Sequence, residues 1–287
     1  MLVETPDGRR LICHPRGKKS QTVVGDHVLW QATQDEGTIE KVLERRNLFY
    51  RQDEIRTKSF AANLDQVLVL IAAEPEFSES QLSRALIAAE AEKIQPIIAL
   101  NKSDLHEPFG RAWERMGVYR AMGYQVLPLA LKPKAGDTTA TELADLMPLL
   151  RGKTTLILGP SGSGKSTFIN RLLPDAQVLT QEISSALNSG KHTTTSTSLY
   201  WVGSDKTTAV IDSPGFQEFG LHHIEPMHLA SLMPDIKAHA GECKFYNCSH
   251  LHEPGCGVRD ALAQQRISPN RYKIYGDLFA ELSQTRY

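Results

Sequence analysis

The sequence of 287 residues has no long apolar run and only four cysteines. No stretch approaches the roughly 20 apolar residues that a membrane-spanning helix needs, and the N-terminus lacks the pattern of a secretory signal peptide. We therefore expect a cytoplasmic protein without a membrane partner. In that compartment, clustered cysteines hold a metal ion more often than they form disulfides.

An excess of charge and low-complexity segments are also absent. The formal net charge is −1, with 41% hydrophobic and 23% charged residues. No global basic field therefore indicates nucleic acid as a partner, which counts modestly against an RNA-binding protein. A chain of this length and composition can form a full α/β core with one or two small additional units.

The segment GPSGSGKS fits the phosphate loop G-x-x-x-x-G-K-[ST] at every position. It lies between an apolar run typical of a buried strand, Thr154–Leu158, and a helical run, Lys165–Leu173. Backbone N–H groups of the loop and of the helix N-terminus would point at phosphates. Lys165 would place a positive charge on the terminal phosphates, and the Ser166 hydroxyl can bind Mg²⁺. The predicted phosphate-binding residues are Gly159, Pro160, Ser161, Gly162, Ser163, Gly164, Lys165, Ser166 and Thr167.

A second motif, NKSD, identifies the nucleotide base. It follows the apolar run Pro96–Leu100 and so lies at the carboxyl end of a predicted strand, where α/β sheets bind ligands. The aspartate of such a motif accepts two hydrogen bonds from guanine, whereas adenine would leave the carboxylate buried and unpaired. We therefore predict GTP as the ligand, with Asp104 on the base and with Asn101, Lys102 and Ser103 completing the loop.

A third motif, DSPG, runs from Asp212 to Gly215 after the apolar run Ala209–Ile211. The three motifs occur in the order NKSD, phosphate loop, DSPG, whereas in ordinary small GTPases the phosphate loop precedes the base-reading motif. The reversed order indicates circular permutation. The same pocket can form if the original chain ends lay close together, as the ends of domains often do.

Three segments follow from the patterning of the chain. Residues 1–62 contain short β-like runs between turns, which predicts an OB-like β-barrel. Residues 63–221 alternate strands with helices, which predicts an α/β P-loop GTPase domain with a mostly parallel sheet. Residues 222–287 form the third segment, a small zinc-binding domain.

The first segment also gathers basic and aromatic residues. They would bind RNA if the aromatic rings offer stacking surfaces. The alternative is a solvated charged surface over core aromatics, and the pattern does not separate the two. The basic residues are Arg9, Arg10, Arg16, Lys18, Lys19, Arg45, Arg46, Arg51, Arg56 and Lys58, and the aromatic residues are Trp30, Phe49 and Tyr50.

The third segment carries a cluster of metal-ligand residues, namely Cys243, Cys248, His250 and Cys256. Three thiolates and one imidazole form a closed four-ligand Zn²⁺ site with no open position, so we predict one structural zinc ion. His252 is a competing ligand that we rank below His250.

Together, the barrel-like start, the permuted GTPase motifs and the segment CKFYNCSHLHEPGC resemble the bacterial small ribosomal subunit biogenesis GTPases of the RsgA family. The resemblance covers essentially the whole chain. It implies a GTP hydrolase that acts in late maturation of the small ribosomal subunit, is activated by that subunit and binds its ribosomal RNA through the flanking domains. We expect a monomer.

The resemblance also assigns roles to residues of DSPG and of the segment GKHTTT, which runs from Gly190 to Thr195. A threonine among Thr193, Thr194 and Thr195 would meet Mg²⁺ and the γ-phosphate; Thr194 and Thr195 are the better candidates, and we assign Thr194. Asp212 would bind Mg²⁺ through water, and the Gly215 N–H would contact the γ-phosphate.

Two positions depart from the usual GTPase pattern. The base-side loop, where many GTPases carry Ser-Ala, keeps only Ala130. Phe216 occupies the position where Ras-like proteins have the glutamine that orients the attacking water. His192, beside Thr193, is one candidate for orienting the water. The alternative is a group supplied by a partner, in which case His192 is an exposed loop residue without a catalytic role.

Two other classes of protein compete with this reading. One is a P-loop enzyme that uses ATP, which Asp104 argues against. The other is an RNA-binding module with a purely structural nucleotide. The switch-like GKHTTT segment and Asp212 argue against it, because a static site needs no γ-phosphate sensor.

Overall fold

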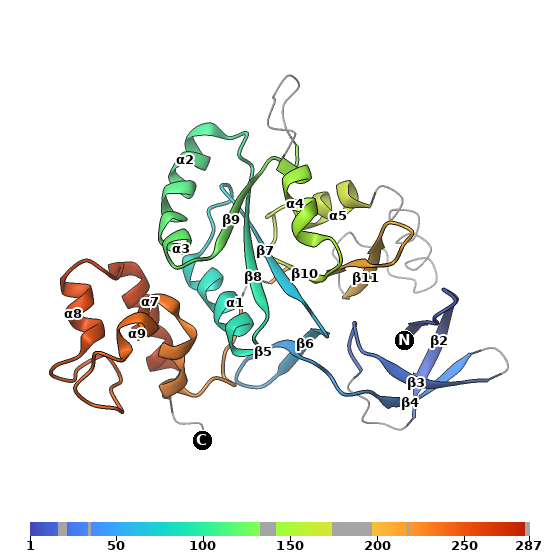
Figure 1. The fold of residues 1–287 in the computed structure, drawn as a ribbon, viewed down its shortest axis with the longest axis horizontal. Helices are drawn as coiled ribbons and strands as arrows, with labels where there is room; N and C mark the ends of the chain where they lie inside the picture. Colours follow the sequence, from blue (N-terminus) through green and yellow to red (C-terminus); the bar gives the residue numbers. More distant parts are fainter. Residues whose placement is uncertain (17–21, 34–35, 133–141, 174–196, 217, 285–287) are drawn as a thin grey trace.

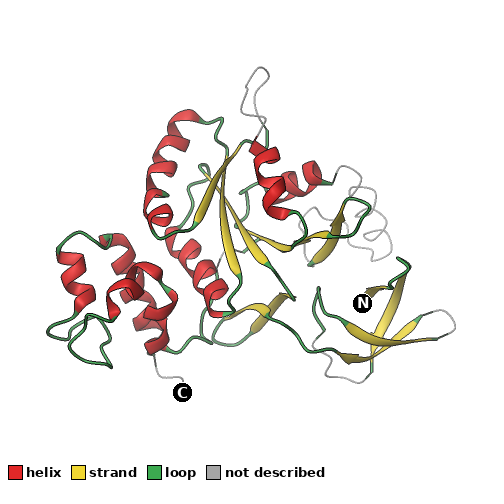
Figure 2. Ribbon diagram, in the orientation of Figure 1, coloured by secondary structure: helices red, strands yellow, loops and turns green. Residues whose placement is uncertain are grey.

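The computed structural model describes residues 1–16, 22–33, 36–132, 142–173, 197–216 and 218–284. Figure 1 shows a central sheet with helices on both faces, flanked by a small β unit formed by the N-terminal part of the chain and a helical unit formed by the C-terminal part. Figure 2 shows strands in the N-terminal part, helices in the C-terminal part and both in the central part.

The N-terminal unit is a four-stranded, half-barrel sheet in the order β1 (Leu2–Glu4), β2 (Arg10–Pro15), β4 (Gly37–Val42) and β3 (Val28–Ala32). Alternate residues point inward, so that the side chains of Cys13 and Ile39 are buried while their neighbours along the strands face solvent. This OB-like sheet confirms the fold predicted for the first segment.

A separate hairpin, β5 (Leu48–Gln52) and β6 (Thr57–Ala62), follows the half-barrel. Its core aromatic rings pack against the segment that follows DSPG: the ring centroid of Phe49 lies 5.8 Å from those of both Phe60 and Phe219. Phe49 is therefore a core aromatic and not a stacking surface. The domain boundary at residue 62 stays a prediction.

The central sheet has the order β11-β12-β10-β7-β8-β9. The strands are β7 (Gln66–Ala72), β8 (Gln95–Asn101), β9 (Gln125–Leu129), β10 (Thr154–Leu158), β11 (Ser198–Val202) and β12 (Thr208–Asp212). All neighbours pair in parallel except β11, which is antiparallel to β12 at one edge. The predicted, mostly parallel sheet is confirmed.

Helices cover both faces of this sheet (Figure 1), and the apolar residues of β7 divide between the two faces. Val67, Val69 and Ile71 join the core that includes α1, whereas Leu68 and Leu70 join the core beneath α4 and α5. A strand buried on both sides reads as a continuous apolar run, which is why this strand was predictable. The helices are α1 (Glu79–Ala91), α2 (His106–Arg115), α3 (Gly117–Ala121), α4 (Glu142–Leu150) and α5 (Lys165–Leu172).

The C-terminal unit contains the 3₁₀ helix η2 (Pro226–Leu232) and the helices α7 (Pro234–Ala240), α8 (Gly257–Ala263) and α9 (Pro269–Leu282). A buried ion pair joins α9 to α7, with Arg271 Nε 2.8 Å from Asp235 Oδ2. The same guanidinium donates to the Ser83 hydroxyl of α1, 2.6 Å away, so the unit is fixed to the central domain. None of the helices that the structure describes is long and apolar enough to cross a membrane.

His223 lies where the hairpin, the central domain and the C-terminal unit join. Its ring packs on Tyr50, with 4.4 Å between centroids, and neither ring nitrogen has a hydrogen-bond partner among the described residues. Burial, with a smaller contribution from His222, lowers the pKa of His223 from 6.5 to about 4. The imidazole is therefore held neutral in the folded protein.

This histidine predicts a loss of stability in mild acid. Because the folded pKa is depressed, the unfolded chain binds the proton first, and stability falls as the pH drops from 6.5 toward 4. At pH 5 we expect His223 to reduce the free energy of unfolding by about 1–2 kcal/mol relative to pH 7. Denaturant unfolding should show that His223→Phe loses this part of the decrease, while His228→Gln, at an exposed histidine, keeps it. Equal acid sensitivity of both variants and the wild type would contradict the prediction.

Candidate functional site

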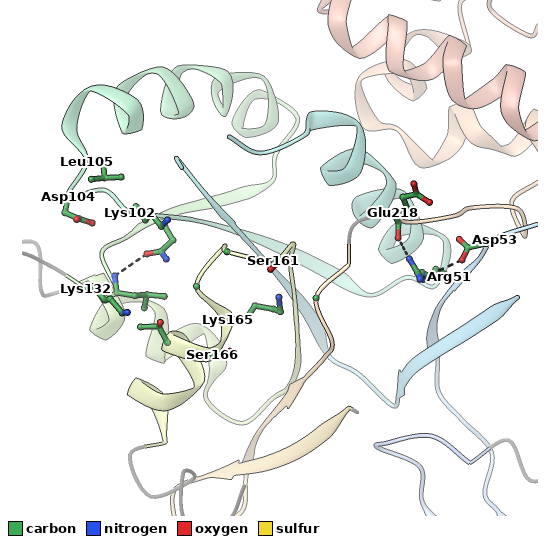
Figure 3. A pocket seen from close by; sticks show the side chains of 16 residues that line it. Arg51, Asp53, Lys102, Asp104, Leu105, Lys132, Ser161, Lys165, Ser166 and Glu218 are labelled. Carbon is green, nitrogen blue, oxygen red and sulfur yellow. Dashed lines mark hydrogen bonds and ion pairs between the residues drawn. The ribbon is translucent and has the colours of Figure 1, made fainter. Parts of the chain in front are cut away.

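The phosphate loop, NKSD and DSPG come together at the carboxyl ends of the parallel strands, around a pocket of about 1110 Å³ (Figure 3). The segment after β10 supplies the phosphate loop, and the segment after β8 supplies NKSD. Ten of the predicted nucleotide-binding residues line this pocket: Asn101, Lys102, Asp104, Ser161, Gly162, Gly164, Lys165, Ser166, Thr167 and Gly215. Ser103, Gly159, Pro160, Ser163 and Asp212 lie beside it and do not line it.

Asn101 ties the base-reading side to the phosphate loop. Its side-chain amide donates to the Ser163 carbonyl at 2.9 Å, and its amide oxygen accepts from the Leu131 N–H at 3.2 Å. Gly164 has φ +104°, and a Cβ there would lie 2.4 Å from the Asn101 amide nitrogen. Glycine is needed at this position, because any side chain would separate the two halves of the site.

The Lys165 ammonium is held against the backbone of the phosphate loop. It donates to the carbonyls of Gly159 at 2.8 Å and Pro160 at 3.2 Å. An ammonium has three donors, so one N–H is left for a group in the pocket. Burial lowers the pKa of Lys165, and the nearby Asp212 carboxylate opposes that shift.

Two oxygen donors suited to a magnesium ion lie near Lys165. Ser166 lines the pocket, and the buried Asp212 ends β12 beside Ile157, its partner in β10. A hydroxyl and a carboxylate are the hard oxygen donors that Mg²⁺ takes alongside nucleotide phosphates. Thr193, Thr194, Thr195 and His192 fall outside the described residues.

The opposite end of the pocket carries Asp104, with Leu105, Leu131 and Lys132 around it (Figure 3). The loop after β9 presents its backbone here, although it lacks the Ser-Ala pair. Arg171 donates to the Ala130 and Leu131 carbonyls at 3.2 and 3.0 Å, which fixes the loop.

Three residues at the phosphate end were not predicted from the sequence: Arg51, Asp53 and Glu218 line the pocket. Arg51 and Asp53 belong to the hairpin β5–β6 and its turn. The signal for Arg51 was its place in the basic run, which we interpreted as a possible RNA-binding surface.

Phe216, at the position of the water-orienting glutamine, is a core residue with 5% exposure. Its ring packs edge-on to Phe219 at 5.5 Å. An apolar ring in this environment has no group with which to orient water.

The predicted zinc ligands form a compact group. The ligand atoms of Cys243, Cys248, His250 and Cys256 all lie within 4.8 Å of one another. Cys243 Sγ is 3.8 Å from Cys256 Sγ and 3.3 Å from His250 Nδ1. Ligands around one tetrahedral zinc ion are separated by roughly 3.5–3.8 Å, so the residues fit that ion. His252 is not part of the group.

Most of the described basic residues of the N-terminal segment pair with carboxylates. The pairs are Arg9–Asp7, Arg10–Glu4, Arg16–Glu40, Arg45–Asp26, Arg46–Asp65 and Arg51–Asp53. Lys18 and Lys19 fall outside the described residues. Ion pairs at the surface contribute little to stability, so this arrangement fits both a solvated charged surface and an RNA-binding patch.

A phosphate loop and an NKSD loop that face one pocket, in reversed chain order, define a circularly permuted P-loop GTPase. Comparison with known proteins gives the same class and a family. The sequence model described as RsgA GTPase matches residues 42–222. The chain belongs to the RsgA GTPase family.

Full-length relatives support this assignment. The chain is 71% identical to the small ribosomal subunit biogenesis GTPase RsgA of Variovorax paradoxus (strain S110), over 100% of this chain and 90% of the relative. It is 52% identical to the protein of the same name from Burkholderia pseudomallei (strain 1710b), over 99% of this chain and 89% of the relative.

Two solved structures are similar to this chain over nearly its whole length. YloQ, described as a circularly permuted GTPase, superposes with a TM-score of 0.72 at 31% identity, covering 100% of this chain and 92% of YloQ. YjeQ from Thermotoga maritima gives a TM-score of 0.74 at 28% identity, covering 99% and 95%. These findings confirm the predicted family and fold.

Proposed function

We propose that this GTPase acts in late maturation of the small ribosomal subunit, binds ribosomal RNA through its flanking domains and is activated by the subunit. The supporting observation is the pocket in which NKSD and the phosphate loop meet, in a chain whose full-length relatives are named small ribosomal subunit biogenesis GTPases. We further propose a cytoplasmic monomer that alternates between GTP and GDP.

Within the pocket, Asp104 would accept the guanine hydrogen bonds and Lys165 would donate its third N–H to the terminal phosphates. The Gly215 N–H would contact the γ-phosphate; its Cα lies against the phosphate loop, where an added Cβ would be 3.2 Å from Lys165 Nζ. The remaining predicted residues of the loop would donate backbone N–H groups to the phosphates.

Ser166, Asp212 and Thr194 would hold Mg²⁺, which when bound would neutralise charge on the phosphates. Cys243, Cys248, His250 and Cys256 would hold one zinc ion with a structural task. Four protein ligands leave no position for water, so this ion would take no part in hydrolysis.

Because Phe216 cannot orient water, another group must do so. We keep His192 as the candidate within this chain, and a group on the ribosomal subunit as the alternative. In both cases the group would reach the water only when the small subunit is bound. We therefore expect slow turnover by the protein alone and faster turnover when the subunit is present. In Ras-like GTPases, an arginine supplied in trans raises turnover by roughly 10³–10⁵-fold.

The test compares GTP, ATP and GDP binding to the purified chain, then measures phosphate release from GTP with and without small subunits. We expect guanine nucleotides to bind preferentially and turnover to rise at least tenfold with subunits. The stimulation should decrease with rising salt, because contacts with RNA phosphates are screened. His192→Ala should reduce stimulated turnover roughly a hundredfold. Equal rates with and without subunits would reject the ribosomal partner; equal affinity for ATP and GTP would reject the guanine site.

A further inference from the structure

The segment that follows DSPG is bound by backbone hydrogen bonds to the hairpin β5–β6. The Gln52 N–H donates to the Gly220 carbonyl at 3.1 Å, and the His222 N–H donates to the Gln52 carbonyl at 2.9 Å. A Cβ on Gly220 would lie 2.5 Å from the Gln52 carbonyl oxygen and 2.3 Å from Asp53 Oδ1. Only glycine permits this close approach, so the segment fits the hairpin as an added strand.

Arg51 extends this attachment to the nucleotide pocket. Its guanidinium donates from Nη1 to the Glu218 carbonyl, and its Nη2 lies 3.8 Å from Asp53 Oδ2. The side chain is only 21% exposed. Figure 3 shows Arg51 and Glu218 at one end of the pocket and Asp104 at the other, with Lys165 between the two ends.

Aromatic packing holds the same segment from its other side. Phe219 contacts Phe216 at 5.5 Å between ring centroids, and it stacks on Phe60 of β6 at 6.1 Å. DSPG itself is fixed to β10, because the Ser213 hydroxyl donates to the Ile157 carbonyl at 2.7 Å. Gly215 therefore lies between two fixed points, and Arg51 provides a polar contact at the second.

We propose that Arg51 is a positioning residue for GTP: it holds the Glu218 carbonyl so that the Gly215 N–H, three residues earlier, is placed for the γ-phosphate. This inference rests on the proposed guanine-nucleotide site. GDP has no γ-phosphate and makes no use of that N–H. Arg51 accordingly sets the preference for GTP over GDP, and it couples the hairpin on the N-terminal side to the state of the nucleotide.

The proposal predicts a selective loss. In the full chain of 287 residues, Arg51→Ala should weaken binding of the non-hydrolysable analogue guanosine 5′-(β,γ-imido)triphosphate about tenfold, the effect of one lost hydrogen bond from a charged donor. Binding of GDP should change less than twofold. Arg56→Ala is the matched control, because Arg56 lies in the turn of the same hairpin, is exposed and makes no side-chain hydrogen bond or ion pair with the described residues.

Titration calorimetry with both nucleotides measures the ratio of affinities, which a general loss of stability would not change. Arg51→Gln keeps a long polar side chain but lacks the charge and the fork of donors, and it should show the same selective loss; it decides the question if Arg51→Ala does not fold. Equal weakening of both nucleotides, or no weakening of either, overturns the role of Arg51. Failure of the wild-type protein to prefer guanine nucleotides would instead reject the proposed function.

Discussion

Cys248→Ser is expected to remove the zinc ion and to destabilise the C-terminal unit by several kcal/mol. Structural zinc sites contribute on the order of 10–16 kcal/mol of binding free energy in small peptides, which is folding free energy when the site forms only in the folded state. The effect should spread to α9, because the Tyr275 hydroxyl donates to the Ser249 carbonyl at 2.8 Å and the Tyr272 hydroxyl donates to the His250 carbonyl at 2.8 Å. The nucleotide pocket has no lining residue in this unit, so guanine-nucleotide binding should remain largely intact.

Elemental analysis of the purified protein should find about one equivalent of zinc per chain, and none after Cys248→Ser. Limited proteolysis should then cleave the C-terminal unit first. Cys13→Ser is the control, because Cys13 is a buried thiol in the half-barrel, outside the metal cluster. Full stability after exhaustive chelation, or wild-type protein without zinc, would contradict the prediction.

Local sequence was sufficient for the elements whose signal lies within a few residues. The strand Thr154–Leu158 has the predicted bounds, because an apolar run of five residues between a turn and a glycine-rich loop is too short for a buried helix. The pattern of residues 111–122 favours a single helix, but the structure has two, α2 and α3, which meet at Met116 before Gly117. Glycine lowers helix propensity, and Met116 and Tyr119, on either side of Gly117, are both buried in the core.

Contacts between distant residues could not be predicted in this way. Arg51 and Glu218 are separated by 167 positions, and nothing in either neighbourhood indicates the other. The basic residues of the first segment were visible as a cluster, but their carboxylate partners depend on strand register and tertiary packing. The Cys/His cluster was predictable because three thiols and one imidazole in a short segment have a shared chemistry. The helices around it were not predicted.

Asp104 gives the second large effect, a change in the base that the pocket accepts. Its carboxylate lies in the pocket near Lys132 and Leu105, at the end away from Lys165 (Figure 3). An asparagine there presents an amide donor to the guanine N–H and amine, so Asp104→Asn should weaken GTP binding by about 1–3 kcal/mol or more. Xanthine carries an oxygen where guanine carries the amine, so the variant should bind xanthosine triphosphate better than GTP.

Competition binding with GTP, xanthosine triphosphate and ATP measures the exchange. Asp53→Asn is the matched control, because it neutralises another carboxylate of the same pocket at the end away from Asp104. We expect that variant to retain the preference for guanine, even if its ratio of GTP to GDP affinity changes through Arg51. A general defect of the pocket would weaken the binding of all three nucleotides in both variants. A base-reading carboxylate instead predicts that only Asp104→Asn binds xanthosine triphosphate more tightly than GTP. If Asp104→Asn lost affinity for GTP and for xanthosine triphosphate equally, the carboxylate would support the loop and would not read the base.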